Sequence, residues 1–209
     1  MMKRRPVVVV LAAGRGMRFR GQGHKLEQAL GPETLLSQTL KNAVQTGLRV
    51  VVVTSENLAG AVRDTVAVRD IIVMPELDEK GRPSPVGMGH SIAAGVAATG
   101  DAEGWLIVPA DMPMLRASSI LRVAEGLEQY PISFAQYKGR RGHPVGFNAE
   151  LFSELVGLQG DEGARRLIAR YPSQGLEVDD PGVLLDIDTT EDLARLRASS
   201  AASSSALPD

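Results

Sequence analysis

Short apolar runs alternate with amphipathic segments from residue 7 to residue 136. The runs are rich in valine and isoleucine, which is typical of strands buried on both faces of a parallel sheet. They cover residues 7–11, 49–54, 70–74, 105–108 and 132–136. Between them, apolar positions recur at helical spacing over residues 34–46, 57–66, 88–98 and 118–129. This alternation predicts an α/β fold with an open sheet and right-handed crossovers.

The second half of the chain has a less regular pattern. We expect a loop over 75–87, a loop at 141–147 that enters a strand, and short strands over 176–178 and 183–187. Helices are expected over 149–156, from 160 onward and over 189–197, with Ser118 or Ser119 capping the helix at 118–129 and Thr189 capping the last. The Ala/Ser-rich residues 198–209 predict a disordered tail. One domain, residues 1–197, is therefore expected.

Composition narrows the class of protein. Of the 209 residues, 44% are hydrophobic and 23% charged, and the net charge of −2 gives no indication of nucleic-acid or membrane binding. The absence of cysteine excludes disulfides and thiolate metal sites. No apolar run approaches 18 residues, and the basic residues 1–5 are not followed by a signal-peptide cleavage pattern. These features predict a cytoplasmic protein.

A glycine-rich, basic loop follows the first apolar run. Its glycines (Gly14, Gly16, Gly21, Gly23) can turn backbone amides inward, and its cations (Arg15, Arg18, Arg20, Lys25) favour an anion. Such a loop at the carboxyl edge of a sheet is suited to a polyphosphate. It is not a P-loop, because no Ser or Thr follows Lys25, and Gly14-x-Gly16 lacks the third glycine of a dinucleotide fingerprint. The alternative is an ordinary strand followed by a solvated basic turn.

Carboxylates follow two of the predicted strands. Asp111 comes just after residues 105–108, where it could hold Mg²⁺ against phosphate oxygens or merely cap the next helix. Asp186 and Asp188 share one side of an extended segment, and one of them could complete a metal site with Asp111. Helix capping is an equally strong explanation for this second acidic pair.

Three further segments are candidates for binding. Gly87, Gly89 and Ser91 lie at a helix start, where free amides could face a nucleotide, although small residues also suit tight packing. His143, between Gly142 and Pro144, either serves a ligand or hydrogen-bonds its turn. The stretch 160–166 is either a capped surface helix or a site where Arg165 faces an anionic second substrate. The three histidines form no zinc pattern.

Six motifs in this order resemble those of the molybdenum cofactor cytidylyltransferases (the MocA-type branch of the MobA-like NTP transferases). They are Leu-Ala-Ala-Gly…Arg-Phe…Lys, Gly-Met-Gly-x-Ser, Ala-Asp-Met-Pro, Gly-His-Pro-Val-x-Phe, Gly-Asp-x-Gly-Ala-Arg and Asp-Ile-Asp-Thr-x-Glu-Asp, and they span residues 6–197. The resemblance implies a Rossmann-like nucleotidyltransferase fold, three-layered, with a mostly parallel mixed sheet. It also implies CMP transfer from CTP to the terminal phosphate of molybdopterin, with Mg²⁺ as cofactor.

The resemblance also implies roles for single residues. Nucleotide-binding residues would be Leu11, Ala12, Ala13, Gly14, Arg15, Gly16, Lys25, Gly87, Gly89 and Ser91. Acceptor-binding residues would be Gly142, His143, Pro144, Gly160, Asp161, Gly163 and Arg165. Arg18, Lys25 and Asp111 would be catalytic, and the metal would be held by Asp111 with Asp186 or Asp188. Ala13 favours CTP, because the guanylyl branch has glycine there. Residues 20–24 make the spacing to Lys25 longer than is usual in the family.

The implied architecture places the NTP in the N-terminal half and the acceptor in the C-terminal half. CTP, molybdopterin and an apo-molybdenum hydroxylase are the implied partners. Two other functions remain open: a nucleotidyltransferase for another phosphorylated acceptor, such as a sugar phosphate or methylerythritol phosphate, and a non-catalytic molybdenum-cofactor chaperone.

Overall fold

The structure is a computed structural model that describes residues 5–14, 16, 19–75 and 87–204. The loop expected over 75–87 therefore falls largely outside the described residues, as do Arg15 and Arg18.

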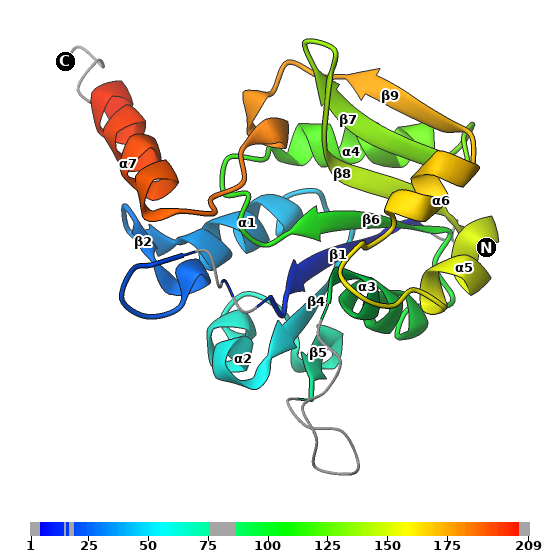
Figure 1. The fold of residues 1–209 in the computed structure, drawn as a ribbon, viewed down its shortest axis with the longest axis horizontal. Helices are drawn as coiled ribbons and strands as arrows, with labels where there is room; N and C mark the ends of the chain where they lie inside the picture. Colours follow the sequence, from blue (N-terminus) through cyan, green and yellow to red (C-terminus); the bar gives the residue numbers. More distant parts are fainter. Residues whose placement is uncertain (1–4, 15, 17–18, 76–86, 205–209) are drawn as a thin grey trace.

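In the described part of the chain, the main sheet has seven strands, of which β8 alone runs against its neighbours. In spatial order they are β5 (Ile71–Met74), β4 (Arg49–Ser55), β1 (Val7–Ala12), β6 (Gly104–Pro109), β8 (Arg140–Asn148), β7 (Ile132–Tyr137) and β9 (Ser173–Glu177). The expected mostly parallel mixed sheet is confirmed (Figure 1). The segment at 141–147, expected to begin as a loop, lies wholly within β8, because it pairs with both β6 and β7.

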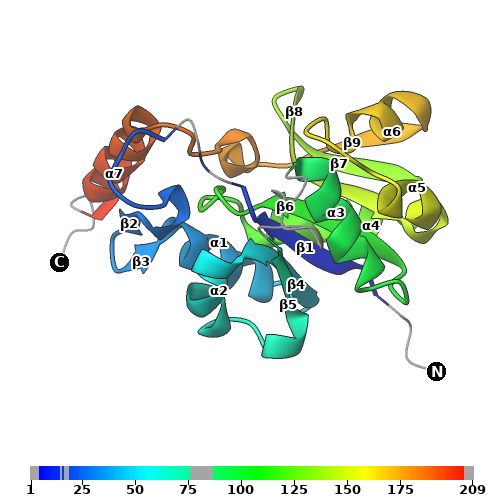
Figure 2. The same cartoon turned by 60° about the horizontal axis from the view of Figure 1, so that its bottom comes forward.

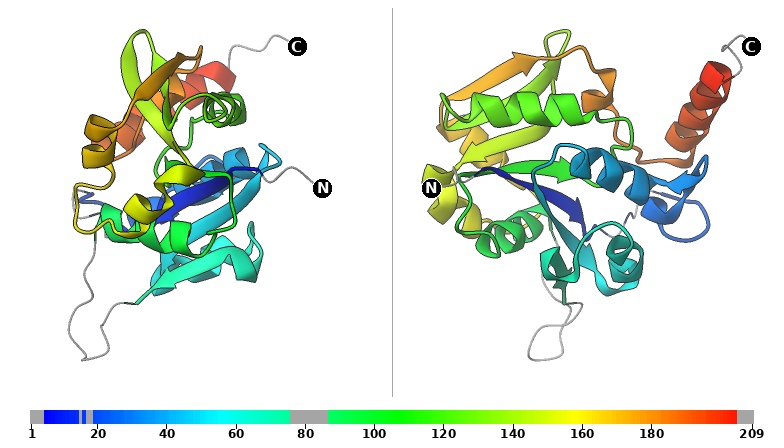
Figure 3. Two further views of the ribbon diagram at one scale, coloured as in Figure 1. Left: turned by 90° about the vertical axis from the view of Figure 1, so that its right-hand side faces the viewer. Right: turned by 180° about the vertical axis from the view of Figure 1, so that it is seen from behind.

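Helices cover both faces of the sheet and make the three layers (Figures 1 and 3). One face is covered by α1 (Leu35–Val44), α2 (Glu56–Arg63) and α4 (Ala117–Gly126). The other is covered by α3 (Met88–Ala97), α5 (Phe152–Val156) and α6 (Arg165–Arg170). Short 3-10 turns are found at η1 (Lys25–Glu27), η2 (Val68–Asp70), η3 (Ala149–Leu151) and η4 (Pro181–Leu184).

The run of four valines in β1 is explained by its central position. Val8 and Val10 pack into the core under α1 and α4, whereas Val7 and Val9 pack into the core under α3. All four are buried, so the strand is a continuous apolar run rather than an alternating one. On the α3 side, Gly95 lets the helix approach closely, since a Cβ there would lie 2.5 Å from Val9 Cγ1.

A small lobe lies beside the carboxyl edge of the sheet. It consists of the antiparallel pair β2 (Ala29–Leu30) and β3 (Glu33–Thr34) and the last helix, α7 (Thr190–Ser204) (Figure 2). Leu193 and Leu196 of α7 are buried against Leu35 and Ile187. This contact fixes the segment before α7, which carries the second acidic pair.

The structure differs from the sequence expectation in several places. The helix expected from residue 160 onward begins only at Arg165, because residues 160–164 form turns and bends. Residues 183–187 are not a strand, because Asp180 caps the turn η4 through the Gly182 amide. The cap of α4 is neither Ser118 nor Ser119: its N-cap is Arg116, whose amide donates to the Asp180 carboxylate. Helix α7 does not end at Arg197 but continues to Ser204, through a segment that contains no proline or glycine to end it.

Residues 205–209 of the expected tail lie outside the described residues. Among the described helices, none has both the length and the apolar content required to span a bilayer.

Candidate active site

The centre of the candidate site is the carboxyl edge of β1 and β6. The two strands are parallel neighbours, and the Ala110 amide just beyond β6 donates to the Leu11 carbonyl at 3.1 Å. Asp111 follows immediately, so it stands beside the start of the glycine-rich loop. Ligands of open α/β sheets bind at this edge.

Lys25 links two carboxylates at this edge. Its Nζ lies 2.6 Å from Asp111 Oδ2 and 3.1 Å from Asp188 Oδ1, and the residue is only 8% exposed. Burial alone would lower the pKa of Lys25, but the charges and hydrogen bonds of Asp111 and Asp188 outweigh it and raise that pKa above its usual value. The lysine is therefore a fixed cation between the two acids.

Asp111 retains unused hydrogen-bonding capacity. Its Oδ1 is buried and has no hydrogen-bond partner among the described residues. Its backbone carbonyl accepts from the Ile187 amide at 3.0 Å, which ties the second acidic segment to the first. A buried carboxylate oxygen without a donor is unfavourable unless a ligand completes it. The alternative role of Asp111, capping the next helix, does not explain why this buried oxygen has no donor in the described part of the chain.

The second acidic pair separates into two environments. Asp188 contacts Lys25, whereas helix capping is performed by Thr189 and Asp192, which exchange hydrogen bonds of 2.9 and 3.1 Å. Desolvation, together with the like charges of Asp188 and Asp111, raises the pKa of Asp186. The structure thus brings both acids near Asp111 and puts Asp188 in direct contact with its lysine partner.

The residues present fit a divalent cation that is shared with phosphate. In the described part of the chain, no three His, Cys, Asp or Glu side chains form a ready-made metal cage. Mg²⁺ is commonly held by one or two carboxylates together with substrate phosphates. Asp111, with its unpaired Oδ1, and Asp188 supply such a pair.

The described part of the glycine-rich loop passes close to Lys25. Gly16 has a φ of +58°, and a Cβ there would lie 3.3 Å from Lys25 Cβ. The Phe19 amide donates to the Gly16 carbonyl at 2.9 Å. Leu11 and Ala12 are the last residues of β1, and Ala13 and Gly14 leave it at the same edge. Of the predicted nucleotide-binding residues, Arg15 lies outside the described residues, as does the predicted catalytic residue Arg18.

The start of α3 packs against the loop before α6. The Gly89 amide donates to the Gly160 carbonyl at 2.9 Å, and the Gly160 amide donates to His90 Nδ1 at 3.2 Å. A Cβ at Gly89 would lie 2.7 Å from the Gln159 carbonyl oxygen, and one at Gly87 would collide with Gly160. The Ser91 hydroxyl donates to the Gly87 carbonyl. The glycines thus join the predicted nucleotide segment to the predicted acceptor segment.

A cleft of about 640 Å³ opens between α3, α6 and β8. Four of the predicted acceptor-binding residues line it: Gly142, His143, Asp161 and Arg165. Pro144, Gly160 and Gly163 do not line it, although a Cβ at Gly163 would lie 2.9 Å from the sulfur of Met88, which does. The structure thus brings predicted residues from β8 and from the segment before α6 together in one cleft.

His143 faces this cleft as a neutral side chain. Burial, reinforced by the positive charge of Arg141 and opposed by Asp111, lowers the pKa of His143 below its usual 6.5. Within the described residues, its imidazole makes no hydrogen bond to the turn, so the turn-bonding alternative finds no support there.

Most residues that line this cleft were not predicted as site residues, and two of them, Arg141 and Phe134, contact each other. The guanidinium carbon of Arg141 is 4.5 Å from the centroid of the Phe134 ring. The alternation along β8 was the available signal, since residues 141, 143 and 145 share one face of a strand. This alternation was not used because residues 141–147 were predicted to begin as a loop.

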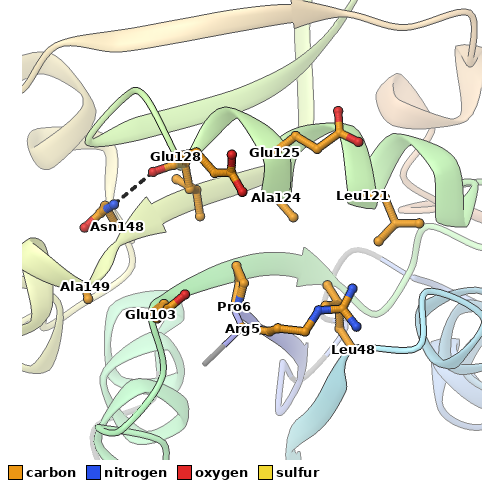
Figure 4. A pocket seen from close by; sticks show the side chains of 11 residues that line it. Arg5, Pro6, Leu48, Glu103, Leu121, Ala124, Glu125, Glu128, Asn148 and Ala149 are labelled. Atoms are coloured by element: carbon orange, nitrogen blue, oxygen red, sulfur yellow. Dashed lines mark hydrogen bonds between the residues drawn. The ribbon is translucent and has the colours of Figure 1, made fainter. Parts of the chain in front are cut away.

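A larger hollow, of about 950 Å³, lies at the opposite edge of the sheet (Figure 4). Arg5 and Pro6 precede β1 there, and Glu103 precedes β6. The Asn148 side chain donates to the Leu127 carbonyl in the same region. Because this hollow is at the amino ends of the parallel strands, it is remote from Asp111 and is not part of the candidate site.

Comparison with known sequences identifies a family. Residues 8–175 match the family described as the MobA-like NTP transferase domain. The purine catabolism protein PucB of Bacillus subtilis is 37% identical over 117 residues, which cover 53% of this chain and 56% of PucB. The chain therefore spans little more than half the length of that relative.

Solved structures match nearly the whole chain. Rv0371c from Mycobacterium tuberculosis H37Rv has a TM-score of 0.76 and 29% identity, covering 93% of this chain and 98% of its own. A structure of Rv0371c in complex with manganese has a TM-score of 0.75 and 28% identity, and the match covers 93% of this chain and 99% of that one.

At 18% identity, the molybdopterin-guanine dinucleotide biosynthesis protein A of Archaeoglobus fulgidus shows a shared fold alone, with a TM-score of 0.70 over 94% of this chain and 99% of its own. Because the family match extends over most of the described fold, including β1, β6 and β8, this chain belongs to the MobA-like NTP transferase domain family.

Proposed function

We propose that this protein transfers CMP from CTP to the terminal phosphate of molybdopterin, or of its molybdenum-loaded form, and releases pyrophosphate. The product would pass to an apo-molybdenum hydroxylase. The single observation that carries the proposal is the Lys25–Asp111–Asp188 cluster at the end of β1 and β6, where one buried oxygen of Asp111 has no donor among the described residues.

The nucleotide half of the proposal rests on the loop after β1. Lys25, Arg15 and Arg18 supply positive charge for a triphosphate, and the turn at Gly16 brings the backbone past Lys25. The choice of cytosine rests on Ala13, which stands where the guanylyl branch of the family has glycine.

The acceptor half of the proposal rests on the cleft beside β8. Its floor is apolar, with Ile92, Ile107 and Val145, and its polar groups include His143 and Arg165. A fused ring system with an attached phosphate would use the apolar floor and the cations Arg141 and Arg165, while Asp161 and Glu162 also line the cleft. The contact between Gly89 and Gly160 joins this side of the cleft to the nucleotide side.

Asp111 and Asp188 would hold a Mg²⁺ ion, the cofactor expected here, which when bound would neutralise charge on the phosphate oxygens. Manganese in the Rv0371c structure supports a divalent cation in this family.

The chain's own residues supply orientation and charge rather than a covalent intermediate. An acceptor phosphate is already ionised at neutral pH, so attack on the α-phosphorus requires no general base. Lys25, together with Arg18, would stabilise the charge that develops as pyrophosphate leaves. The neutral His143 would contact the acceptor without adding charge, because burial lowers its pKa.

Pyrophosphate release tests this proposal. The purified protein would be incubated with Mg²⁺, molybdopterin and each of CTP, GTP, ATP and UTP in turn. We expect release with CTP and little with the other three. Release with a sugar phosphate or methylerythritol phosphate in place of molybdopterin would favour a different acceptor. Binding of molybdopterin without release would favour a chaperone.

A further inference from the structure

Arg141 occupies an unusual position in the acceptor cleft. It is the second residue of β8, two positions before His143 and on the same face of the strand. Its guanidinium lies over the Phe134 ring of β7, 4.5 Å from the ring centroid. A cation held over an aromatic face keeps a preferred place without a carboxylate partner.

No anion among the described residues neutralises this guanidinium. Some arginines of the chain have such partners: Arg49 is bonded to Asp70 at 2.8 Å, and Arg116 lies beside Asp180. Two carboxylates line the cleft with Arg141: Glu162 pairs with Arg166 at 2.6 Å, and Asp161 makes no ion pair with Arg141. Partial burial lowers the pKa of Arg141, as expected for a cation that has lost water without gaining a counter-charge.

Strand β8 brings Arg141 to the same edge of the sheet as Asp111. Strands β6 and β8 run in opposite directions, and their last pair at this edge joins Ile107 with Val145. Beyond it β6 leads to Asp111, and the amino-terminal end of β8 carries Arg141, although the pairing of β8 with β7 is irregular between Val145 and Arg141. The charges of Asp111 and Arg141 both act on His143, Asp111 raising its pKa and Arg141 lowering it, so the imidazole lies near both.

We propose that the Arg141 guanidinium, held over Phe134, binds the phosphate of the acceptor and so selects phosphorylated acceptors. A guanidinium offers a planar fork of donors that matches two phosphate oxygens. This role rests on the proposed nucleotidyl transfer and assigns to one residue the recognition of the attacking group. Arg165 lies across the cleft on α6 and would face the remainder of the acceptor.

The test compares Arg141→Ala and Arg141→Lys with the matched control Arg140→Ala, whose exposed side chain does not line the cleft. Phenyl phosphate, an aromatic ring that carries a phosphate monoester, serves as the binding probe in a calorimetric or NMR titration. In parallel, KM values for CTP and for molybdopterin are measured by pyrophosphate release. Circular dichroism melting reports whether each variant folds, and Phe134→Leu, which keeps the arginine but removes the ring, gives a second test.

We expect Arg141→Ala to weaken phenyl phosphate binding and raise the KM for molybdopterin about 10- to 100-fold, the effect of losing a charged hydrogen bond. Arg141→Lys should recover part of this loss, Phe134→Leu should show a smaller loss, and the KM for CTP should change less than about twofold. Arg140→Ala should behave as the wild type.

The proposed function and this inference can fail separately. If the wild type releases no pyrophosphate with molybdopterin but Arg141→Ala loses phenyl phosphate binding, the assignment of Arg141 stands and the acceptor is a different phosphate. If Arg141→Ala binds phenyl phosphate as the wild type does, or if the wild type itself does not bind it, the inference is overturned.

Discussion

Lys25 Nζ lies 2.6 Å from Asp111 Oδ2, although the two residues are 86 positions apart in the chain. Lys25 comes from the turn after the glycine-rich loop, and Asp111 from the end of β6. A second contact of the same ammonium, 3.1 Å from Asp188, adds the segment before α7. Three distant parts of the sequence thus meet at one cation, at the edge of the sheet where phosphates are expected.

Replacing Asp111 with asparagine should lower kcat by about 10³-fold, because the neutral amide can neither hold a cation nor pair with Lys25. The near-identical shape and the remaining contact of Lys25 with Asp188 should keep the chain folded, with a lower melting temperature because a buried ion pair is lost. Asp101→Asn, at an exposed position outside the site, is the matched control and should retain full activity. Near-normal turnover in Asp111→Asn would remove Asp111 from the catalytic centre.

Asp180 should be a major contributor to stability. Its buried carboxylate accepts hydrogen bonds from the Arg116 amide, the Ser119 hydroxyl and the Gly182 amide, at 2.7–2.9 Å. Asp180→Ala leaves these donors unpaired and should reduce the free energy of unfolding by about 2–4 kcal/mol. Asp179→Ala, at the exposed neighbour, should change it by less than about 0.5 kcal/mol. Urea denaturation measures the free energy of unfolding of both variants. Equal losses in the two would contradict the stabilising role assigned to Asp180.

Gly89→Ala should separate α3 from the loop before α6. The new Cβ would lie 2.7 Å from the Gln159 carbonyl oxygen, so either the helix or the loop must shift. We expect a raised KM for the acceptor, together with a loss of about 1–3 kcal/mol in the free energy of unfolding. The same substitution at Gly60, which has open space around it within α2, should instead stabilise the protein by about 0.5–1 kcal/mol. An unchanged melting temperature and KM in Gly89→Ala would show that this contact has no role.

Stability should fall as the pH drops below 6.5 because of His143. Burial lowers its pKa in the folded protein, so the unfolded chain takes up a proton that the folded chain does not, and acid therefore favours unfolding. The loss should begin near pH 6.5 and end below the pKa of the folded state. His143→Gln should flatten this part of the stability profile. Its imidazole NMR signal in the wild type should titrate below pH 6.5, and a midpoint at or above 6.5 would contradict the account.

The sequence predicted a strand correctly wherever its apolar residues are the ones that the fold buries. The valines of β1 and β4 are buried on both faces, so their strands stand out as continuous apolar runs. Residues 183–187 also looked like a strand, but the Asp180 cap and the packing of Ile187 against α7 hold them in another conformation. Both of those contacts are tertiary, and no local pattern reports them.

The sequence singled out the chemical groups of the candidate site, but not which of them contact one another in the structure. Asp111 and Lys25 were identified by motif, whereas the contact of Lys25 with Asp188 instead of Asp186 depends on how α7 packs. Arg141 was missed because its role depends on the pairing of β7 with β8, which places Phe134 beneath its guanidinium. Strand pairing is not encoded in any single segment.

The most direct test of the central claim follows the α-phosphorus of CTP. The protein would be incubated with Mg²⁺, molybdopterin and CTP labelled with ³²P at either the α or the γ position, and the products would be separated by chromatography. Nucleotidyl transfer predicts that the α label appears in a molybdopterin–cytidine dinucleotide and the γ label in pyrophosphate. Recovery of the α label only in CTP or free CMP would contradict it.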